Sequence, residues 1–428
     1  MIFKKFYSQA YVWIWLPQAE DPVVAGVLNQ INDRLVFNYG RNYLNNTDAI
    51  AIYSPELPLQ SGPIPLLPDL MMPGCIRDAS PDAWGRRVLM NYFMQEVHVR
   101  SMTHDLSELD YLLESGSDRI GALDFQESPT RYVPRKRQIG TLDELYAASE
   151  KVEKGEILTP ELDIALQHGT SIGGARPKVL LESDSRQWIA KFSTSTDMFN
   201  LVKTEFLAMR LAEQVGLKVA HVELTKALGK DVLLIERFDR IKQVGWTRKA
   251  LVSALTILEL DEMMAPYASY EKLAEIMRRQ FKNPQSDLKE LFGRIVFNIL
   301  CGNTDDHARN HAAFWDGSFL ELTPAYDICP QSRTGQEATQ AMLISGLHRQ
   351  SNLVTCLMGA PQFLLSKDEA INIINHQIQV IQHSWSDICH IAQLSEVERR
   401  YLMGRQFLNP FAFFHAPTEI IRPAQFVG

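Results

Sequence analysis

The ten residues GNTDDHARNH, at positions 302–311, follow the apolar run IVFNIL and combine two carboxylates, two imidazoles, two side-chain amides and a guanidinium. One interpretation of them is purely structural. Asn303, Asp305 and Asp306 are residue types that favour caps and turns, so they predict the end of a helix near Gly302. A turn of this composition needs no ligand, and a functional interpretation requires support from elsewhere in the chain.

The two histidines of this stretch allow an alternative based on a metal. His307 and His311 are four residues apart, which would place them on one face of a helix, as in zinc-binding helices. Ala308 stands where a zinc peptidase has its catalytic glutamate, and the cysteines of the chain are not at zinc-binding spacing. The zinc interpretation therefore rests on the two histidines alone.

The same stretch also has the spacing of a phosphoryl-transfer site. Asp305 and Asn310 are five residues apart, as in the kinase loop where an Asp accepts the proton of the substrate hydroxyl and an Asn holds magnesium. Asp327 in LTPAYDICP, after a connection long enough for a β-hairpin, is a second carboxylate for Mg²⁺. Upstream, Lys191 in WIAKFS ends a predicted strand, as does the kinase lysine that contacts ATP phosphates. Glu205, on the next predicted helix, could pair with Lys191.

A glycine-rich segment precedes these elements. In HGTSIGGARPKVLL, Gly173 and Gly174 would let backbone amides approach phosphates, and Lys178 supplies a positive charge at the start of a strand. The segment is neither a Walker A motif nor the G-x-G-x-x-G loop of protein kinases. A plain glycine turn in a β-hairpin is the alternative.

Periodicity predicts an α+β chain in which strands come first and helices last. The first β-prone runs are YVWIWL, RLVFNYG and AIAIYS. A second group of strands surrounds the helical segment DMFNLVKTEFLAMRLAEQVG: PKVLLES, QWIAKFS, HVELTKAL and DVLLIERF. Long helical patterns follow in EKLAEIMRRQF, DLKELFGRIVFNIL and DEAINIINHQIQVIQHSW. Thr141 and Glu144 match a capping box that opens a further helix.

These patterns predict a protein-kinase-like, two-lobed fold with a small β-rich N-terminal subdomain and a mostly helical C-terminal lobe. The expected parts are 1–125 for the N-terminal subdomain, 126–140 for a linker, 141–245 for an ATP-binding β-rich lobe and 246–428 for a helical catalytic lobe.

Composition limits the possible partners and compartment. The 428 residues carry a net charge of -8, which gives no basic field to attract nucleic acid, so we expect no direct contact with DNA or RNA. No apolar run approaches the length of a membrane span, so we expect no membrane contact. The five cysteines are odd in number and scattered, which is typical of free thiols in a cytoplasmic protein.

Six segments, in this order, resemble the HipA-like serine/threonine kinases, toxins of bacterial toxin–antitoxin systems: TSIGGARPKVLL, IAKF, TEFLAMRLAEQVGL, LLIERFDR, NTDDHARNHAAF and LTPAYDI. RDASPDAWGRRVL and the β-rich start resemble the first subdomain of that family, so the resemblance covers most of the chain. It implies ATP and Mg²⁺ as cofactors, a protein substrate such as an aminoacyl-tRNA synthetase or another translation component, and a helix-turn-helix antitoxin as partner. The roles it implies are a catalytic base at Asp305, magnesium ligands at Asn310 and Asp327, phosphate contacts at Lys178 and Lys191, further ATP contacts at Gly173, Gly174, His307, Glu236 and Phe238, and autophosphorylation at Ser171.

Two residues depart from the family loop. Asp306 stands where the family usually has Gly, so a second carboxylate adjoins the base, and Arg309 replaces a Lys. Two other functions stay open at this point. One is a small-molecule phosphotransferase on the same fold, and the other is a pseudokinase that acts as a binding module for a DNA-binding antitoxin.

Overall fold

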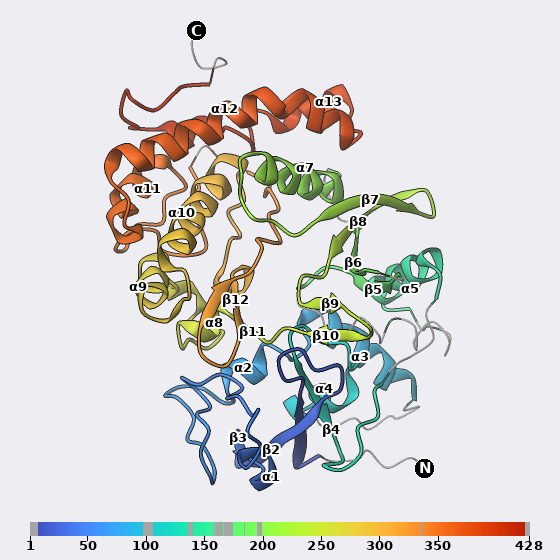
Figure 1. Ribbon diagram of the computed structural model, residues 1–428. Coiled ribbons are helices and arrows are strands. Elements are labelled where there is room, and N and C mark those ends of the chain that lie inside the picture. Colours follow the sequence, from blue (N-terminus) through green and yellow to red (C-terminus); the bar gives the residue numbers. More distant parts are fainter. Residues whose placement is uncertain are drawn as a thin grey trace. The chain divides into compact units, whose positions relative to one another are not determined.

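The computed structural model of the protein describes residues 7–96, 106–135, 140–156, 158, 166, 174–183, 185–194, 199–333, 335 and 337–423 (Figure 1). The chain divides into two compact units, and each is assembled from separate segments. Unit 1 comprises Met1–Ser195, Thr225–Val252 and Trp315–Ser318. Unit 2 comprises Thr196–Leu224, Ser253–Phe314 and Phe319–Gly428. The four-part division expected from the sequence stays a prediction.

Unit 1 begins with a four-stranded antiparallel sheet in the order β3-β2-β1-β4. Its strands are β1 (Gln9–Ile14), β2 (Val23–Ile31), β3 (Arg34–Tyr39) and β4 (Leu123–Gln126). β1 and β3 confirm the strands predicted at YVWIWL and RLVFNYG. β2 requires glycine at position 26, because a Cβ there would lie 2.2 Å from the backbone oxygen of Asn38. Three short helices accompany the sheet: α1 (Arg41–Leu44), α2 (Gly74–Arg77) and α4 (Glu108–Glu114).

The expectation of a strand at AIAIYS, residues 49–54, is wrong. The segment is largely buried, but side chains rather than a neighbouring strand satisfy its backbone. The Ile52 amide donates to the Tyr39 hydroxyl at 2.9 Å, and the Tyr43 hydroxyl donates to the Ile50 carbonyl at 2.8 Å. Apolar residues here fill the core without forming a β-ladder.

A short segment from far along the chain completes this part of unit 1. The buried indole of Trp315 packs edge-to-face on Tyr53, with ring centroids 5.6 Å apart. Its Nε1 donates to the Ala51 carbonyl at 2.8 Å, and its backbone amide donates to the Ala250 carbonyl at 2.9 Å. Residue 315 is therefore part of the core of unit 1.

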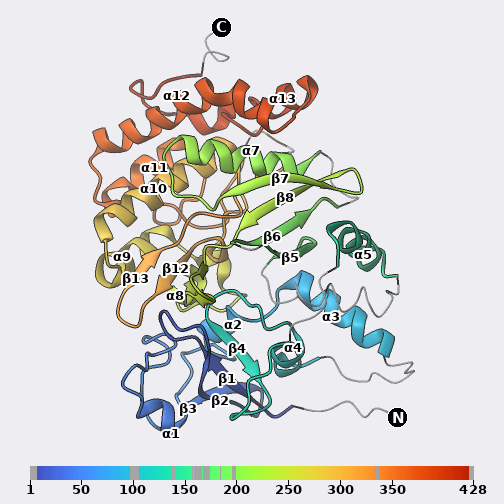
Figure 2. The same cartoon turned by 45° about the vertical axis from the view of Figure 1, so that its right-hand side comes forward.

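A second sheet has the order β5-β6-β8-β7. Its strands are β5 (Lys178–Glu182), β6 (Gln187–Phe192), β7 (Val222–Ala227) and β8 (Lys230–Glu236), and a hairpin of β9 (Arg240–Lys242) and β10 (Trp246–Arg248) follows. Two helices of unit 1, α3 (Ala83–Glu96) and α5 (Leu142–Lys154), share one hydrophobic core with this sheet (Figure 2). Thr141 and Glu144 form the capping box predicted for α5.

Buried ion pairs tie the segment after β8 to residues 118–121, which precede β4. Arg237 donates to Asp118 and to Asp239 at 2.9 Å each, and Arg240 donates to the same two carboxylates at 2.8 Å each. Although burial opposes ionisation, Arg237 and Arg240 lower the pKa of Asp239 to about 2. The network fixes the chain on both sides of residue 238.

Unit 2 is mostly helical. It contains α7 (Leu201–Gln214), α8 (Ala254–Ile257), α9 (Tyr270–Gln280), α10 (Pro284–Cys301), α11 (Leu353–Gly359), α12 (Lys367–Ile391) and α13 (Glu396–Leu402). α9, α10 and α12 confirm the three long helices predicted from periodicity. α12 lies along α7 in both cartoon views, and the Lys203 ammonium of α7 donates to the Gln393 carbonyl just beyond α12 at 2.9 Å (Figures 1 and 2). Three short strands, β11 (Leu251–Ser253), β12 (Ala312–Trp315) and β13 (Leu320–Leu322), contain residues of both units, with residues 251, 252 and 315 in unit 1.

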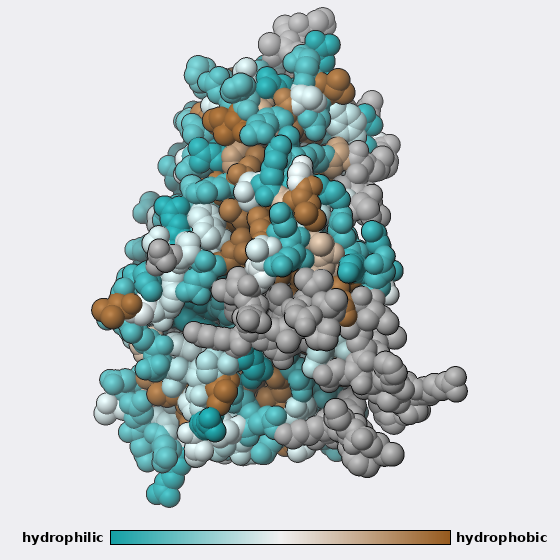
Figure 3. All heavy atoms as spheres, turned by 90° about the vertical axis from the view of Figure 1, so that its right-hand side faces the viewer, coloured by the Kyte–Doolittle hydropathy of each residue, from teal (hydrophilic) through white to brown (hydrophobic). Residues whose placement is uncertain are grey.

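No helix in the described part of the chain is long and apolar enough to cross a membrane. On the face drawn in Figure 3, hydrophobic residues are scattered among hydrophilic ones. Scattered apolar residues of this kind are ordinary for a protein surface.

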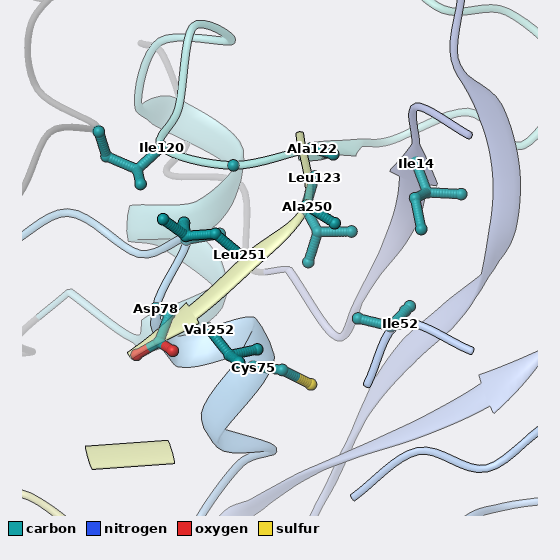
Figure 4. Close-up of a pocket in the computed structure, with 12 residues that line it drawn as sticks. Ile14, Ile52, Cys75, Asp78, Ile120, Ala122, Leu123, Ala250, Leu251 and Val252 are labelled. Atoms are coloured by element: carbon teal, nitrogen blue, oxygen red, sulfur yellow. The ribbon is translucent and has the colours of Figure 1, made fainter. Parts of the chain in front are cut away.

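A small pocket in unit 1 lies between the first sheet and α2 (Figure 4). Aliphatic side chains line most of it, together with the Cys75 thiol and the Asp78 carboxylate. None of the predicted site residues lines this pocket.

Candidate active site

The described part of the glycine-rich segment begins at Gly174, in unit 1. Its backbone amide donates to Asp82 Oδ2 at 2.5 Å, and its carbonyl accepts from the Trp84 amide at 3.3 Å. Gly174 has a φ of +107°, and a Cβ on it would lie 2.1 Å from the ammonium nitrogen of Lys178. Glycine is therefore required here by both backbone conformation and space. Ser171 and Gly173 lie outside the described residues.

The two lysines predicted to contact phosphates occupy neighbouring strands. Lys178 at the start of β5 pairs directly with Lys191 on β6, so the two side chains project from the same face of the sheet. Both residues are buried. The Trp84 indole donates to the Lys178 carbonyl at 3.1 Å and anchors α3 to this strand. The sheet thus brings two positive charges together beside the glycine segment.

Glu236 and Phe238 lie where β8 ends. Glu236 pairs with Trp188 on β6, and its carboxylate is 3.6 Å from the guanidinium of Arg186. Phe238 is half-buried and lies between Arg237 and Asp239 of the buried ion network. This segment is therefore held in place by charges on both sides.

In unit 2, the stretch that begins at Gly302 forms a tight loop after α10. Gly302 ends the helix with a φ of 74°, and a Cβ on it would lie 2.7 Å from the carbonyl oxygen of Gln406. The loop ends in a single 3-10 turn, Ala308–Asn310. The Asn310 side-chain amide donates to the Asp305 carbonyl at 3.2 Å, which closes the loop on itself. The helix end expected near Gly302 is confirmed.

The two adjacent aspartates of the loop have opposite surroundings. Asp305 is exposed, whereas Asp306 is buried. Partial burial raises the pKa of Asp305, and the carboxylates of Asp327 and Asp306 act in the same direction against His307. A carboxylate whose pKa is raised and that solvent can reach is suited to accept a proton.

Asp306 is instead the centre of a buried hydrogen-bond network. It accepts from the Tyr270 hydroxyl of α9, from the Asn298 amide of α10 at 2.7 Å, and from His311 Nε2 at 3.0 Å. Although burial opposes ionisation, these partners lower the pKa of Asp306, with His311 contributing most. The carboxylate joins the loop to two helices and is not placed to serve as a second base.

Asp327 follows the predicted β-hairpin, formed by β12 and β13. It has a φ of +59°, in the left-handed region that costs a residue other than glycine about 1–3 kcal/mol. The preceding residue, Tyr326, donates from its hydroxyl to the Arg309 carbonyl at 2.8 Å. Arg309 in turn forms an ion pair with Glu262 at 2.7 Å. The strained backbone at Asp327 is thus held next to the loop that carries Asp305.

The residues fit a magnesium ion better than zinc. Asn310 and Asp327 offer oxygen donors, which Mg²⁺ prefers, and the Asn310 side-chain oxygen accepts no hydrogen bond from any described residue. His311 Nε2 is occupied by Asp306, and the described residues contain no cluster of three or more His, Cys, Asp or Glu side chains that could hold a metal. Nothing in these ranges supports the zinc interpretation of His307 and His311.

Several residues of this site were not singled out from the sequence. Asp82, which accepts from Gly174, lies in the segment SPDAW, next to the start of α3. Tyr270 and Asn298 gave no signal, because a tyrosine or asparagine within a helical pattern is ordinary. Lys191 belongs to unit 1 and Glu205 to unit 2, and their pairing stays a prediction.

Comparison with known families assigns most of the chain. A model of the HipA-like C-terminal domain matches residues 170–385, which is half of the sequence, and a model of the HipA N-terminal domain matches residues 15–126. The serine/threonine-protein kinase toxin HipA of Shewanella oneidensis is 27% identical over 184 residues, which are 37% of this chain and 42% of that protein. A provisionally named kinase of Haemophilus influenzae is 30% identical over 182 residues, or 38% of this chain and 53% of that protein. The aligned regions span about half or less of these relatives.

One solved structure shares the fold over nearly the whole chain. It is the complex of HipA, HipB and operator DNA from Shewanella oneidensis, with a TM-score of 0.67, an identity of 18%, and coverage of 93% of this chain and 95% of that one. This likeness confirms the predicted α+β, kinase-like fold class.

Proposed function

The chain belongs to the HipA-like family, and on this premise we propose that it is an ATP-dependent serine/threonine protein kinase and the toxin of a bacterial toxin–antitoxin system. The observation that carries the proposal is the arrangement of Asp305, Asn310 and Asp327 within unit 2. An exposed carboxylate with a raised pKa adjoins two oxygen donors, one of them on a strained backbone. That combination serves proton acceptance beside a bound cation.

In the proposed reaction Asp305 accepts the proton of a serine or threonine hydroxyl. The hydroxyl oxygen forms a bond to the γ-phosphorus as the bond between that phosphorus and the leaving oxygen of ADP breaks. Asn310 and Asp327 would hold Mg²⁺, which would neutralise charge on the phosphates. Asp306 keeps the loop in position through Tyr270 and Asn298 and takes no proton.

ATP contacts are proposed for residues of both units. Lys178 and Lys191, paired on β5 and β6, match the charge of the phosphates. The backbone amides of Gly173 and Gly174 are proposed to bind them as well, with a phosphate oxygen replacing Asp82 as the acceptor of the Gly174 amide. Glu236 and Phe238, on the segment fixed by the ion network, contact the adenine. His307 adds a contact from the catalytic loop.

Regulation and partners are proposed from the family. Ser171 is the expected autophosphorylation site, and a phosphate there would occupy space that ATP phosphates need. A helix-turn-helix antitoxin is the expected inhibitor, and a translation component such as an aminoacyl-tRNA synthetase is the expected substrate. The S. oneidensis complex contains operator DNA, so the expectation that this chain itself has no nucleic-acid contact stays a prediction, as does a cytoplasmic location.

Incubation with γ-labelled ATP and Mg²⁺, alone and with a cell lysate, tests the proposal. Label on protein serine or threonine, lost in Asp305→Asn, supports a protein kinase. Label only on a small molecule would replace it with the small-molecule phosphotransferase. No transfer by folded, nucleotide-binding protein would favour a pseudokinase that acts as a binding module.

A further inference from the structure

Asp82 places a carboxylate against the glycine-rich segment of unit 1. Its Oδ2 accepts a hydrogen bond from the Gly174 backbone amide at 2.5 Å, across 92 positions of the chain. Asp82 directly precedes α3, and its carbonyl accepts from the Arg86 amide at 2.9 Å in the first turn of that helix. A carboxylate before a helix usually accepts from amides of the same helix. Here it accepts from the amide that is proposed to bind an ATP phosphate.

The surroundings of Gly174 are those of an anion-binding position. The Lys178 ammonium lies beside it, because a Cβ built on Gly174 would be 2.1 Å from Nζ. Lys191 pairs with Lys178 across β5 and β6 and adds a second positive charge on the same face of the sheet. A backbone amide next to an ammonium suits either a carboxylate or a phosphate. The carboxylate that accepts from the Gly174 amide in the structure is that of Asp82.

The attachment of α3 to the glycine segment does not depend on this carboxylate alone. The Trp84 amide donates to the Gly174 carbonyl at 3.3 Å, and its buried indole donates to the Lys178 carbonyl at 3.1 Å. These two bonds join the start of α3 to both ends of the segment 174–178 through uncharged groups. A rotation of the Asp82 side chain can therefore free the Gly174 amide while the segment stays attached to α3.

We propose that Asp82 is an internal competitor of the nucleotide, so that its carboxylate occupies a phosphate position at Gly174 and ATP displaces it on binding. This inference rests on the proposed function. The exchange replaces one charge-assisted hydrogen bond by another, so the Gly174 amide has an acceptor before and after it. The displaced carboxylate stays near the phosphates, where like charges repel each other. Asp82 therefore lowers the affinity for ATP.

Asp82→Asn tests the competition, because asparagine keeps an oxygen acceptor for the Gly174 amide and removes the charge. Calorimetric titration of the full chain with β,γ-imido-ATP and Mg²⁺ should show binding about fivefold tighter than that of the wild type, since the competing acceptor has become neutral. This analogue is not a phosphoryl donor, so the protein does not modify itself during the titration. The affinity for adenosine, which has no phosphate, should stay unchanged.

Glu108→Gln is the matched control. It also removes one negative charge near α3, but its carboxylate pairs with the Arg86 guanidinium at 2.7 Å rather than with Gly174. Its affinity for β,γ-imido-ATP should equal that of the wild type.

Hydrogen exchange of the Gly174 amide, followed by NMR in protein labelled at glycine, tests the displacement itself. In the wild type this amide should be protected both with and without β,γ-imido-ATP, since an acceptor is present in each state. In Asp82→Ala it should exchange faster without the analogue and become protected when the analogue binds. Exchange that stays fast in the bound Asp82→Ala variant would show that no phosphate takes the position, and would overturn the inference.

The titration has further outcomes that would overturn it. Weaker binding of the analogue by Asp82→Asn would show that the carboxylate holds the segment ready for the nucleotide instead of competing with it. Equal gains for the analogue and for adenosine would show an effect that is not directed at the phosphates. Unchanged binding by Asp82→Asn sinks this inference alone, whereas a wild type that binds no analogue at all sinks the proposed kinase function with it.

Discussion

Replacing each of the two adjacent aspartates by asparagine should have opposite consequences. Asp305→Asn should abolish phosphoryl transfer and leave stability within about 0.5 kcal/mol, as for an exposed side chain that forms no hydrogen bond with any described residue. Asp306→Asn should destabilise unit 2. The same chemical change one residue apart thus separates a reacting group from a structural one.

The magnitude for Asp306 follows from its three donors. All three donors contact Oδ2, and His311 Nε2 is also 3.0 Å from Oδ1. An asparagine whose oxygen replaces Oδ2 therefore keeps Tyr270 and Asn298 but turns its NH₂ group toward the imidazole N–H. One buried donor without an acceptor costs about 1–3 kcal/mol. The two remaining bonds lose their charge assistance, about 0.5–1 kcal/mol each. The expected loss is therefore about 2–5 kcal/mol in the free energy of unfolding.

Chemical denaturation measures this loss, and hydrogen exchange of peptides from α9 and α10 localises it, because Tyr270 and Asn298 lie there. The pH dependence supplies a second check. The folded-state pKa of Asp306 is lowered, so its contribution is complete above the ordinary carboxyl range and is lost as pH falls through the lowered value. The pKa of Asp305 is raised, so its charge destabilises the folded state as pH rises through that value, and Asp305→Asn should be neutral or slightly stabilising at pH 7. Equal stability losses for the two variants would refute this division of roles.

Three other outcomes are expected. Asp327→Asn should reduce phosphoryl transfer by orders of magnitude and weaken the dependence on Mg²⁺, which a magnesium titration of the initial rate would detect. Arg237→Met should destabilise unit 1 by about 3–5 kcal/mol in denaturant titrations, because Asp118 and Asp239 then share Arg240 alone and one negative charge of the network is uncompensated. A change within experimental error would show that Arg237 contributes nothing to stability. Mass spectrometry after incubation with ATP should find phosphate on Ser171 in the wild type but not in Asp305→Asn, whereas phosphate in both would point to a contaminating kinase.

Local patterns in the sequence were enough to predict most of the helices and strands and the order of the motifs. The capping box at Thr141 and the helix that ends at Gly302 depend on neighbours within a few residues, so they could be read directly. The strand predicted at AIAIYS does not form, because backbone groups of this segment bond to the side chains of Tyr39 and Tyr43. No local pattern in the sequence reveals such bonds.

The division of roles between Asp305 and Asp306 could not be predicted. Which carboxylate turns inward is decided by Tyr270, which is 36 residues away along the chain, and by Asn298 on a neighbouring helix. The contact of Asp82 with Gly174 is likewise a tertiary property, since the two residues are 92 positions apart. Motif spacing predicts which residue types meet, whereas burial decides what each of them does.

The place of Trp315 in the core of unit 1 has a consequence for synthesis on the ribosome. The first 195 residues of that unit leave the exit tunnel long before residue 315 is made. During this interval the Tyr53 ring and the Ala51 carbonyl lack their contacts with the Trp315 indole. A nascent chain in this state exposes an aromatic patch that chaperones recognise or that promotes aggregation. Any truncated product that stops before residue 315 carries the same defect permanently, so genetic dissection of this protein should cut beyond Ser318 or supply the missing segment in trans.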